Sequence, residues 1–563
     1  MRKVVLTLLI LGVGAPCFAK YSGGTGDANT PYQIANAADL MTLANDANDY
    51  NKCFIMTTDL DLDPNLPGGR IFRTAVISPD VNHKNGIYDG NSFNGVFDGA
   101  GHKITNLTID ANSVRNDYIG LFGDVNRGEI KNLSLENVKI SIKTYSYYLG
   151  GLVGENWANI SNCYSTGSVT MQGSSSYSSY VGGLVGGNHS NISNCYSTVF
   201  VSNGKNSYYL GGLVGWNDGT INNCHTTGVV TGGDYTSENG GLVGCNMLNG
   251  TISNCYSTGN VSGGNYACCL GGLVGWNNGT INNCHTTGNI TGGSWGYGGL
   301  VGRCEEGSII DCYSTGTVTG ENQLGGLVGD NRGNVSYCHS TGNVTGGSNI
   351  GGLMGVNYSS INSCYSTGDV NGDAESGGNG GLVGVTFGNV SNCFSTGDVN
   401  GRIIIAGLVG ENDESEIINC YSTGIVTGIA KSGLVYSNNG TIINCYFLTT
   451  SGPNNGYGTP LTDVQMKQQA SLVGWDFVWE TANGPNDIWA ICEGVSYPKL
   501  AWQFIAGDSD NDKNVDFTDF ALLANKWMQA DSNLYCGGAD LTGDGKVDIA
   551  DLAAFSSNWL AGL

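Results

Sequence analysis

The chain has 563 residues, of which 91 are glycine and only 12 % are charged, whereas an average globular chain has roughly 7 % glycine and about 25 % charged residues. Because 40 % of the residues are hydrophobic, the composition excludes a chain that stays disordered through high charge and low hydrophobicity. The 23 basic and 47 acidic residues give a net charge of −24, which argues against binding to nucleic acid or to an anionic membrane surface. The composition favours a secreted, repetitive β protein.

The first residues have the pattern of an export signal. Arg2 and Lys3 carry positive charge, residues 4–13 are mostly apolar, and a stretch of small residues ends at Ala19. An apolar segment of about ten residues is too short to cross a bilayer, which needs about 20. We expect residues 1–19 to be a signal peptide and the mature protein to be secreted, extracellular or on a bacterial cell surface, without a membrane span.

One short motif recurs along most of the chain. The motif Gly-Leu-Val-Gly and its variants occur twelve times at spacings of 26 to 32 residues, and each copy contains about three apolar, strand-sized pieces separated by Gly or Asn. This content predicts one coil of a parallel β-helix per copy. We therefore expect an all-β repeat solenoid, a parallel β-helix expected to be right-handed, whose twelve coils form a rod on the order of 55 Å long. The motif leucines are Leu121, Leu152, Leu184, Leu213, Leu242, Leu273, Leu300, Leu327, Leu353, Leu382, Leu408 and Leu434.

The repeated units resemble the GLUG-motif repeats of bacterial secreted and surface proteins over residues 119–450. Such repeats accompany adhesins and proteases alike, so the resemblance implies a fold more than a function. Segments such as residues 97–104 (Phe-Asp-Gly-Ala-Gly-His-Lys-Ile) are similar to the region that precedes the repeats in such proteins. We expect residues 20–118 to form an N-terminal cap and the first coils, and residues 451–506 to form an apolar C-terminal cap, because an uncovered β-helix end is an open sheet edge.

A cysteine follows each motif leucine by about eleven residues in eleven copies, and a ring follows each cysteine. We predict that the cysteines are interior and mostly reduced, because identical positions on stacked coils do not have disulfide geometry. The ring lies an even number of residues before polar residues such as Asn260, Asn343 and Asp369. Since alternate residues of a strand point to the same side, the ring is predicted to face water. The ring column is either a structural ladder or a stripe that binds an extended polysaccharide or cell-surface glycan. Its candidate glycan-binding residues are Tyr164, Tyr196, His225, Tyr256, His285, Tyr313, His339, Tyr365, Phe394 and Tyr421.

A second column lies four residues after the motif leucine and is mostly asparagine, for example Asn217 and Asn277. Asparagine binds turn backbone groups with its own side chain and tolerates left-handed conformations. We therefore interpret this column as turn chemistry.

Signatures of catalysis are nearly absent from the chain. No His-Glu-x-x-His occurs, and residues 292–296 match the nucleophile elbow only within a Gly-rich turn. Glu155, Asp330 and Glu411 lie on distant copies. We predict no catalytic residue, while a polysaccharide lyase or glycoside hydrolase on the β-helix remains the alternative.

The tail after Gly507 has a different composition. It contains two acidic twelve-residue loops, and their acidic residues and the apolar residues that follow them recur after 32 residues. Each loop places oxygen atoms at the spacing that suits Ca²⁺, and a helix with apolar residues is expected after each loop. The predicted ligands are Asp508, Asp510, Asp512, Asn514, Asp516 and Asp519 in the first loop, and Asp540, Thr542, Asp544, Lys546, Asp548 and Asp551 in the second, with Asn514 and Lys546 acting through their carbonyl groups.

This tail, residues 507–563, resembles a type I dockerin, the module by which secreted carbohydrate-active proteins attach to cohesins. The resemblance implies Ca²⁺ as the cofactor and a cohesin-like partner. The residues in the positions that help choose the partner are Phe517, Thr518, Ile549 and Ala550. They depart from the common Ser-Thr pair, and in the alternative interpretation Phe517 and Ile549 pack against the cap of the rod.

Together these features indicate a secreted, non-catalytic β-helix protein of a surface or extracellular complex, adhesive or glycan-binding, attached through a calcium-dependent dockerin-like module. The alternative is a polysaccharide-degrading enzyme displayed through the same module.

Overall fold

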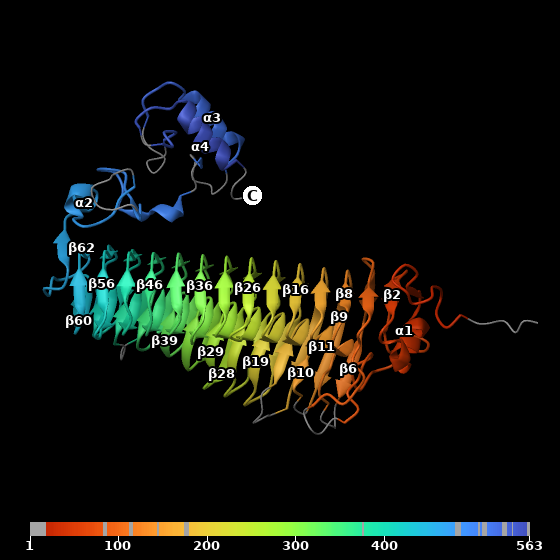
Figure 1. The fold of residues 1–563 in the computed structure, drawn as a ribbon. Coiled ribbons are helices and arrows are strands. Elements are labelled where there is room, and N and C mark those ends of the chain that lie inside the picture. Colours follow the sequence, from red (N-terminus) through yellow and green to blue (C-terminus); the bar gives the residue numbers. More distant parts are fainter. Residues whose placement is uncertain are drawn as a thin grey trace, which may run out of the picture.

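The chain is a parallel β-solenoid of about twelve coils with a small helical region at its C-terminal end, as Figure 1 shows. This confirms the predicted fold class. The predicted signal peptide, except Ala19, lies outside the described residues. The computed structural model describes residues 19–82, 87–111, 116–143, 146–173, 179–373, 377–478, 486–504, 507–508, 515–531, 538–542, 544 to 559.

Four sheets run along the rod, and each coil adds a strand to each sheet in turn. In the coil of Leu273 these strands are β29 (Cys268–Gly271) in sheet 1, β30 (Val274–Asn277) in sheet 2, β31 (Thr280–Asn282) in sheet 3, and β32 (His285–Thr286) with β33 (Ile290–Gly293) in sheet 4. Over the described residues sheet 1 runs from β10 (Tyr148–Leu149) to β59 (Lys431–Ser432), and sheet 2 from β7 (Phe122–Val125) to β60 (Val435–Asn438). Sheet 3 runs from β1 (Tyr32–Ile34) to β61 (Thr441–Ile443), and sheet 4 from β3 (Leu60–Asp61) to β63 (Thr459–Leu461).

The interior of the rod is filled by columns of identical side chains. The motif leucines and the valine that follows most of them are fully buried, as are the isoleucine and valine columns of sheets 3 and 4. The eleven repeat cysteines are free and at most 3 % exposed, and in the ten from Cys163 to Cys420 the backbone nitrogen lies 3.3 to 3.4 Å from the sulfur of the next coil's cysteine. Burial raises the pKa of thiols such as Cys312 and Cys338, so the predicted interior thiols are confirmed.

The asparagine column lies inside the rod at the corner between sheets 2 and 3. The Asn217 Nδ2 donates to the carbonyl oxygen of Gly219 at 3.0 Å, which confirms the predicted turn chemistry, and also to Asn246 Oδ1 at 2.8 Å. The second bond continues from coil to coil and forms a buried amide chain that sequence reasoning did not foresee. Cys304 and Thr386 replace asparagine in two coils and accept the bond from the preceding asparagine.

The residue directly before each repeat cysteine has left-handed backbone geometry, with φ between 49° and 55° from Asn162 to Asn444. Asparagine occupies most of these positions because its short polar side chain tolerates this conformation. The left-handed residue turns the chain from sheet 3 into sheet 4.

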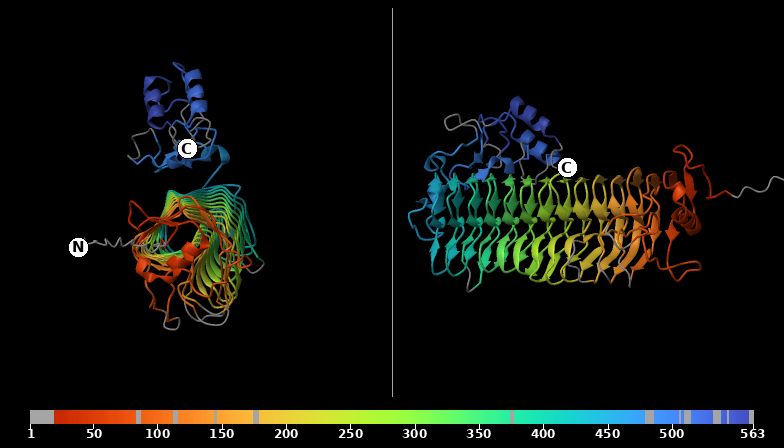
Figure 2. Two further views of the ribbon diagram at one scale, coloured as in Figure 1. Left: turned by 90° about the vertical axis from the view of Figure 1, so that its right-hand side faces the viewer. Right: turned by 60° about the horizontal axis from the view of Figure 1, so that its bottom comes forward.

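Helix α1 (Ala37–Asn45), with the single turn η1 (Ala47–Asp49), lies at the N-terminal end of the rod, as both views in Figure 2 show. Leu40 and Leu43 of α1 are fully buried in the main core. The side chain of Asn36 caps the helix by accepting from Asp39 N at 3.0 Å. The helix therefore covers the open end of the first coil.

The segment after the last coil turns back along the side of the rod, as Figure 2 shows. It contains α2 (Asp463–Met466), η2 (Gln469–Ser471), η3 (Ala501–Gln503) and the antiparallel pair β64 (Trp489–Ala490) and β65 (Lys499–Leu500). Trp475, Trp489 and Leu500 are fully buried in a separate core that includes rings of sheet 4. The segment thus packs on the ring column as well as following the last coil.

Candidate calcium-binding and partner-binding sites

The C-terminal module contains two helices of equal length whose bounds differ by 32 residues. They are α3 (Phe517–Asn525) and α4 (Ile549–Ser557). Val515 and Val547, and likewise Leu523 and Phe555, are equivalent under this shift, and all four are buried in one small core. The two halves therefore fold alike, as the repeated spacing predicts.

The ninth and twelfth positions of each loop form a capping box at the start of the helix that follows. Asp516 Oδ1 accepts from Thr518 N at 2.7 Å, and Asp519 Oδ2 accepts from Asp516 N at 2.9 Å. Asp548 and Asp551 make the same bonds with Ala550 N and Asp548 N, at 2.8 and 2.7 Å. The loop carboxylates are thus held at helix N-termini, where the helix dipole stabilises negative charge.

The second loop folds around two buried carboxylates. Asp540 Oδ2 accepts from Gly545 N at 2.7 Å, and Asp551 Oδ1 accepts from the N–H groups of Leu541 and Thr542 at 2.8 and 2.9 Å. Asp540 is 2 % exposed and Asp551 is fully buried, while Gly545 takes a left-handed φ of 86° at the sharp turn. The exposed Asp544 and Lys546 and the half-buried Asp548 complete the predicted set of ligands.

The first loop is described only at its two ends. Asp508 is 4 % exposed and Asp519 is fully buried, and both are equivalent to the two buried carboxylates of the second loop. The predicted ligands Asp510, Asp512 and Asn514 lie outside the described residues. Within the described ranges, no three His, Cys, Asp or Glu side chains are close enough together to hold a metal ion. A divalent cation would offset the repulsion between four carboxylates that are buried in so small a module.

The four predicted partner-contacting residues all lie at the starts of the two helices and are exposed. Phe517 is 76 % and Ile549 is 69 % exposed, and neither packs against the rod. The Phe517 ring meets the Trp559 ring edge-on at 5.0 Å. Thr518 and Ala550 are also exposed. The alternative in which Phe517 and Ile549 are buried against the cap of the rod is therefore wrong.

The predicted ring column forms a continuous stack on the outer side of sheet 4. Consecutive rings from Tyr164 to Tyr421 have centroids 4.6 to 5.2 Å apart and planes within 11° of parallel. The rings from Tyr164 to Tyr365 are half-buried. Partial burial lowers the pKa of His225 and His285, so these imidazoles are neutral at neutral pH.

Two members of the predicted glycan stripe do not face water. Phe394 is 4 % and Tyr421 is 1 % exposed, because Trp489 packs on both rings and Trp475 packs on Tyr421. Tyr421 also donates its hydroxyl hydrogen bond to the carbonyl oxygen of Pro498 at 2.6 Å. The prediction of an outward ring was wrong for these two coils, because the C-terminal segment covers them.

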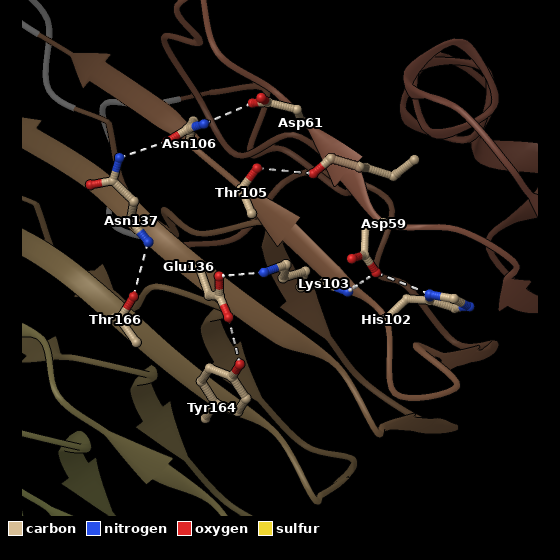
Figure 3. A network of polar contacts seen from close by, with 11 residues as sticks. Asp59, Asp61, His102, Lys103, Thr105, Asn106, Glu136, Asn137, Tyr164 and Thr166 are labelled. Carbon is tan, nitrogen blue, oxygen red and sulfur yellow. Dashed lines mark hydrogen bonds and ion pairs between the residues drawn. The ribbon is translucent and has the colours of Figure 1, made fainter.

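The N-terminal end of the ring stack contacts a network of polar side chains, drawn in Figure 3. Tyr164 Oη donates to Glu136 Oε1 at 2.8 Å, and Lys103 Nζ lies 3.0 Å from Glu136 Oε2. One coil closer to the N-terminus, His102 Nδ1 lies 3.0 Å from Asp59 Oδ1. The register places Ser134 and Lys103 in the ring column of the two coils before Tyr164, so the stack begins at Tyr164.

Sequence reasoning missed a third column, on the outer side of sheet 2. It is the third residue of each Val-Gly-x-Asn strand, and the register aligns its members from coil to coil. This position varies while the residues around it repeat, and that contrast is the signal that could have identified it. Its members include Asp124, Glu155, Trp216, Trp276, Arg303, Asp330 and Glu411.

Two family models match the chain. The GLUG motif matches six segments, residues 145–170, 177–202, 206–231, 240–262, 266–291 and 293–319. The type I dockerin domain matches residues 506–557. Type I dockerin domains bind calcium and cohesins, and no helix among the described residues is long and apolar enough to span a membrane.

Two curated relatives share part of the chain. Halomucin of Haloquadratum walsbyi is 32 % identical over 162 residues, which are 28 % of this chain and 2 % of Halomucin. A protein of Evansella cellulosilytica, provisionally named a Gly-rich membrane protein, is 31 % identical over 161 residues, which are 28 % of this chain and 17 % of that protein. The chain therefore spans only a small fraction of either relative.

One solved structure, a protein of Bacteroides ovatus provisionally described as an immunoglobulin A1 protease, aligns over 86 % of this chain and 96 % of its own. At 16 % identity and a TM-score of 0.28, it informs neither the fold nor the function here. The chain is a parallel β-solenoid that carries GLUG motifs and a C-terminal type I dockerin domain.

Proposed function

We propose that this protein is a non-catalytic extracellular rod that binds a cohesin on a partner protein through its calcium-loaded dockerin. The GLUG β-solenoid and the dockerin together support an extracellular protein anchored in a complex. The observation that carries the proposal is the paired exposure of Phe517 and Ile549 at equivalent helix starts. An exposed large apolar pair at a repeated position is better explained by a partner than by folding.

Calcium would be held by the two loops, whose donors are all hard oxygen atoms. Asp516 and Asp548 are each half-buried at a helix N-terminus. The buried pair in each loop, Asp508 with Asp519 and Asp540 with Asp551, would be neutralised by one cation. When bound, calcium supplies positive charge that holds each loop against its helix.

Isothermal titration calorimetry of the full chain tests this part of the proposal. We expect chelator-treated protein to bind two Ca²⁺ ions, and Asp516→Ala and Asp548→Ala each to remove one site. Asp398→Ala, an exposed aspartate of the rod, is the matched control and should leave both sites intact. Absence of calcium binding, or loss of a site in the control, would refute the assignment.

A further inference from the structure

The outer side of sheet 2 concentrates charge in a rod that is otherwise poor in charged residues. Between residues 146 and 450 the sequence has five basic residues, Lys205, Arg303, Arg332, Arg402 and Lys431. Two of them, Arg303 and Arg332, lie on adjacent coils, and Arg303 pairs in register with Asp330. This clustering is not required by the repeat, since other coils place Trp, Cys or Val at the same position.

These residues line a depression of about 410 Å³, whose walls come from sheets 1 and 2 and from the residues that flank their strands. Sheet 1 contributes Trp295, the first residue of β34 (Trp295–Gly298), together with Asn322 and Gln323 of β39 (Asn322–Gly325). The side of sheet 2 contributes Arg303 of β35 (Val301–Cys304) and Asp330 of β40 (Val328–Asn331). The remaining lining residues are Arg332, Asn349 and Tyr358.

Asp330 is a buried carboxylate with an unmet hydrogen bond. Its residue is 4 % exposed, and its Oδ1 accepts no hydrogen bond from any described residue. The nearest cationic groups are Arg332 Nε at 3.7 Å from Oδ1 and Arg303 Nε at 3.8 Å from Oδ2, both longer than a hydrogen bond. A buried acceptor left in this state is costly, which favours a ligand that donates to it.

Arg332 presents the complementary group on the same depression. Its guanidinium lies over the Tyr358 ring at 4.6 Å and forms long ion pairs, with Nε 3.7 Å from Asp330 Oδ1 and one Nη 3.8 Å from Glu305 Oε1. Arg303, in contrast, donates to Glu305 at 2.6 Å. The depression therefore offers one acceptor, Asp330, and one donor fork, Arg332, next to each other. Adjacent hydroxyl groups on a ring can donate to the first and accept from the second.

One exposed aromatic side chain, Trp295, completes the site, while Tyr358 is stacked on Phe387 and lies under Arg332. Trp295 is 37 % and Tyr358 is 42 % exposed, and both line the depression with the amide side chains of Asn322 and Gln323. A flat ring offers apolar contact area, while the few polar groups around it fix the orientation of a ligand. This combination suits a molecule with one apolar face and an edge of hydroxyl groups.

We propose that this depression binds a neutral pyranose unit of a polysaccharide. The C–H face of the sugar stacks on Trp295, one hydroxyl donates to Asp330, and a neighbouring oxygen accepts from Arg332. The ligand is neutral because the two arginines balance Asp330 and Glu305, and because a chain of net charge −24 repels polyanions. The site lies on a different sheet from the predicted ring stripe and does not depend on the dockerin.

Calorimetric titration of the full chain with soluble hexasaccharides tests the proposal. The probes are neutral gluco-, xylo- and manno-hexasaccharides and the acidic hexagalacturonate. We expect the wild type to bind at least one neutral probe with little dependence on salt. Trp295→Ala and Arg332→Gln should each weaken that binding by about tenfold or more, the effect of losing one charged hydrogen bond or ring contact. Tyr266→Ala, a 64 % exposed ring outside the depression, is the matched control and should bind as the wild type does.

Asp330→Asn keeps the shape of the side chain and should also weaken binding, with its thermal midpoint measured to exclude unfolding. Trp295 is exposed, so its variant decides the question if Asp330→Asn is unstable. The proposal is overturned if no neutral probe binds, if only hexagalacturonate binds and salt abolishes that binding, or if Trp295→Ala binds as tightly as the wild type.

Discussion

At the scale of single residues, the buried amide chain explains why asparagine recurs at one position of nearly every coil. An asparagine there satisfies its own turn and also donates to the next coil. The bond within the turn was predictable from one repeat, because it is local. The bond to the next coil was not, because it depends on the stacking register, which one repeat does not reveal.

Replacing Asn217 by Ala should destabilise the rod by about 3 kcal/mol, because it leaves the buried Asn188 Nδ2 and Asn246 Oδ1 without this partner. Urea unfolding of the full chain measures the loss. Asn249→Ala, which removes only an exposed bond to Asp218, should change the free energy of unfolding by less than about 0.5 kcal/mol. Equal losses in the two variants would show that the chain of amides contributes nothing.

Asp124 is a second residue whose environment has a measurable consequence. It is 4 % exposed and pairs in register with Glu155, and burial raises its pKa to about 7. Its pKa in the unfolded chain is about 3.9. The folded state therefore holds a proton that the unfolded state releases, so stability falls as pH rises from about 4 to about 7.

Asp124→Asn should abolish this dependence on pH. We expect the variant to be more stable than the wild type at about pH 8, by at most about 4 kcal/mol, and the advantage to shrink at about pH 5. Thermal unfolding at both pH values gives the comparison. A stability difference that does not change with pH would mean that Asp124 is ionised in the folded protein.

At the scale of elements, the coils were predictable because each motif carries its own strands and turns. The path of the C-terminal segment was not predictable from the sequence. Phe394 and Tyr365 occupy the same position of the repeat, yet Phe394 is 4 % exposed under Trp489 while Tyr365, which contacts Trp502, stays half-buried. In the dockerin, the 32-residue shift allowed both helices and their caps to be predicted, since their contacts are local.

Replacing a covered ring should reduce the free energy of unfolding more than replacing an uncovered ring. Tyr421→Ala removes a buried ring held by Trp475, Trp489 and the carbonyl oxygen of Pro498, and should cost about 3–5 kcal/mol. Tyr256→Ala removes a half-buried ring stacked on His225 and His285, and should cost about 1 kcal/mol.

Tryptophan fluorescence during thermal unfolding separates the two cases. Tyr421→Ala should release the C-terminal segment below the main transition and shift emission to longer wavelength, as Trp475 and Trp489 become hydrated. Tyr256→Ala should keep a single transition. Identical behaviour of the two variants would contradict the packing of the C-terminal segment on the ring stack.

At the scale of the whole molecule, a stiff rod is joined to a small module whose apolar residues Phe517 and Ile549 remain exposed. Helix α1 covers the N-terminal end of the rod, and the C-terminal segment packs on the ring column along its side. Calcium and a partner protein are therefore expected at the dockerin, and the polysaccharide site at the side of the rod. The protein would thus attach to its partner through the dockerin and recognise polysaccharide through the rod.

The most direct measurement is capture of partners from the secreted fraction of the source organism, with the full chain as bait. We predict capture of a cohesin-containing protein in the presence of Ca²⁺, and its loss with chelator or in the double variant Phe517→Ser and Ile549→Ser. Ile429→Ser changes an 80 % exposed residue of the rod and should capture as the wild type does. Capture that is unchanged by chelator and by the double variant, or no cohesin-containing protein at all, would contradict the account.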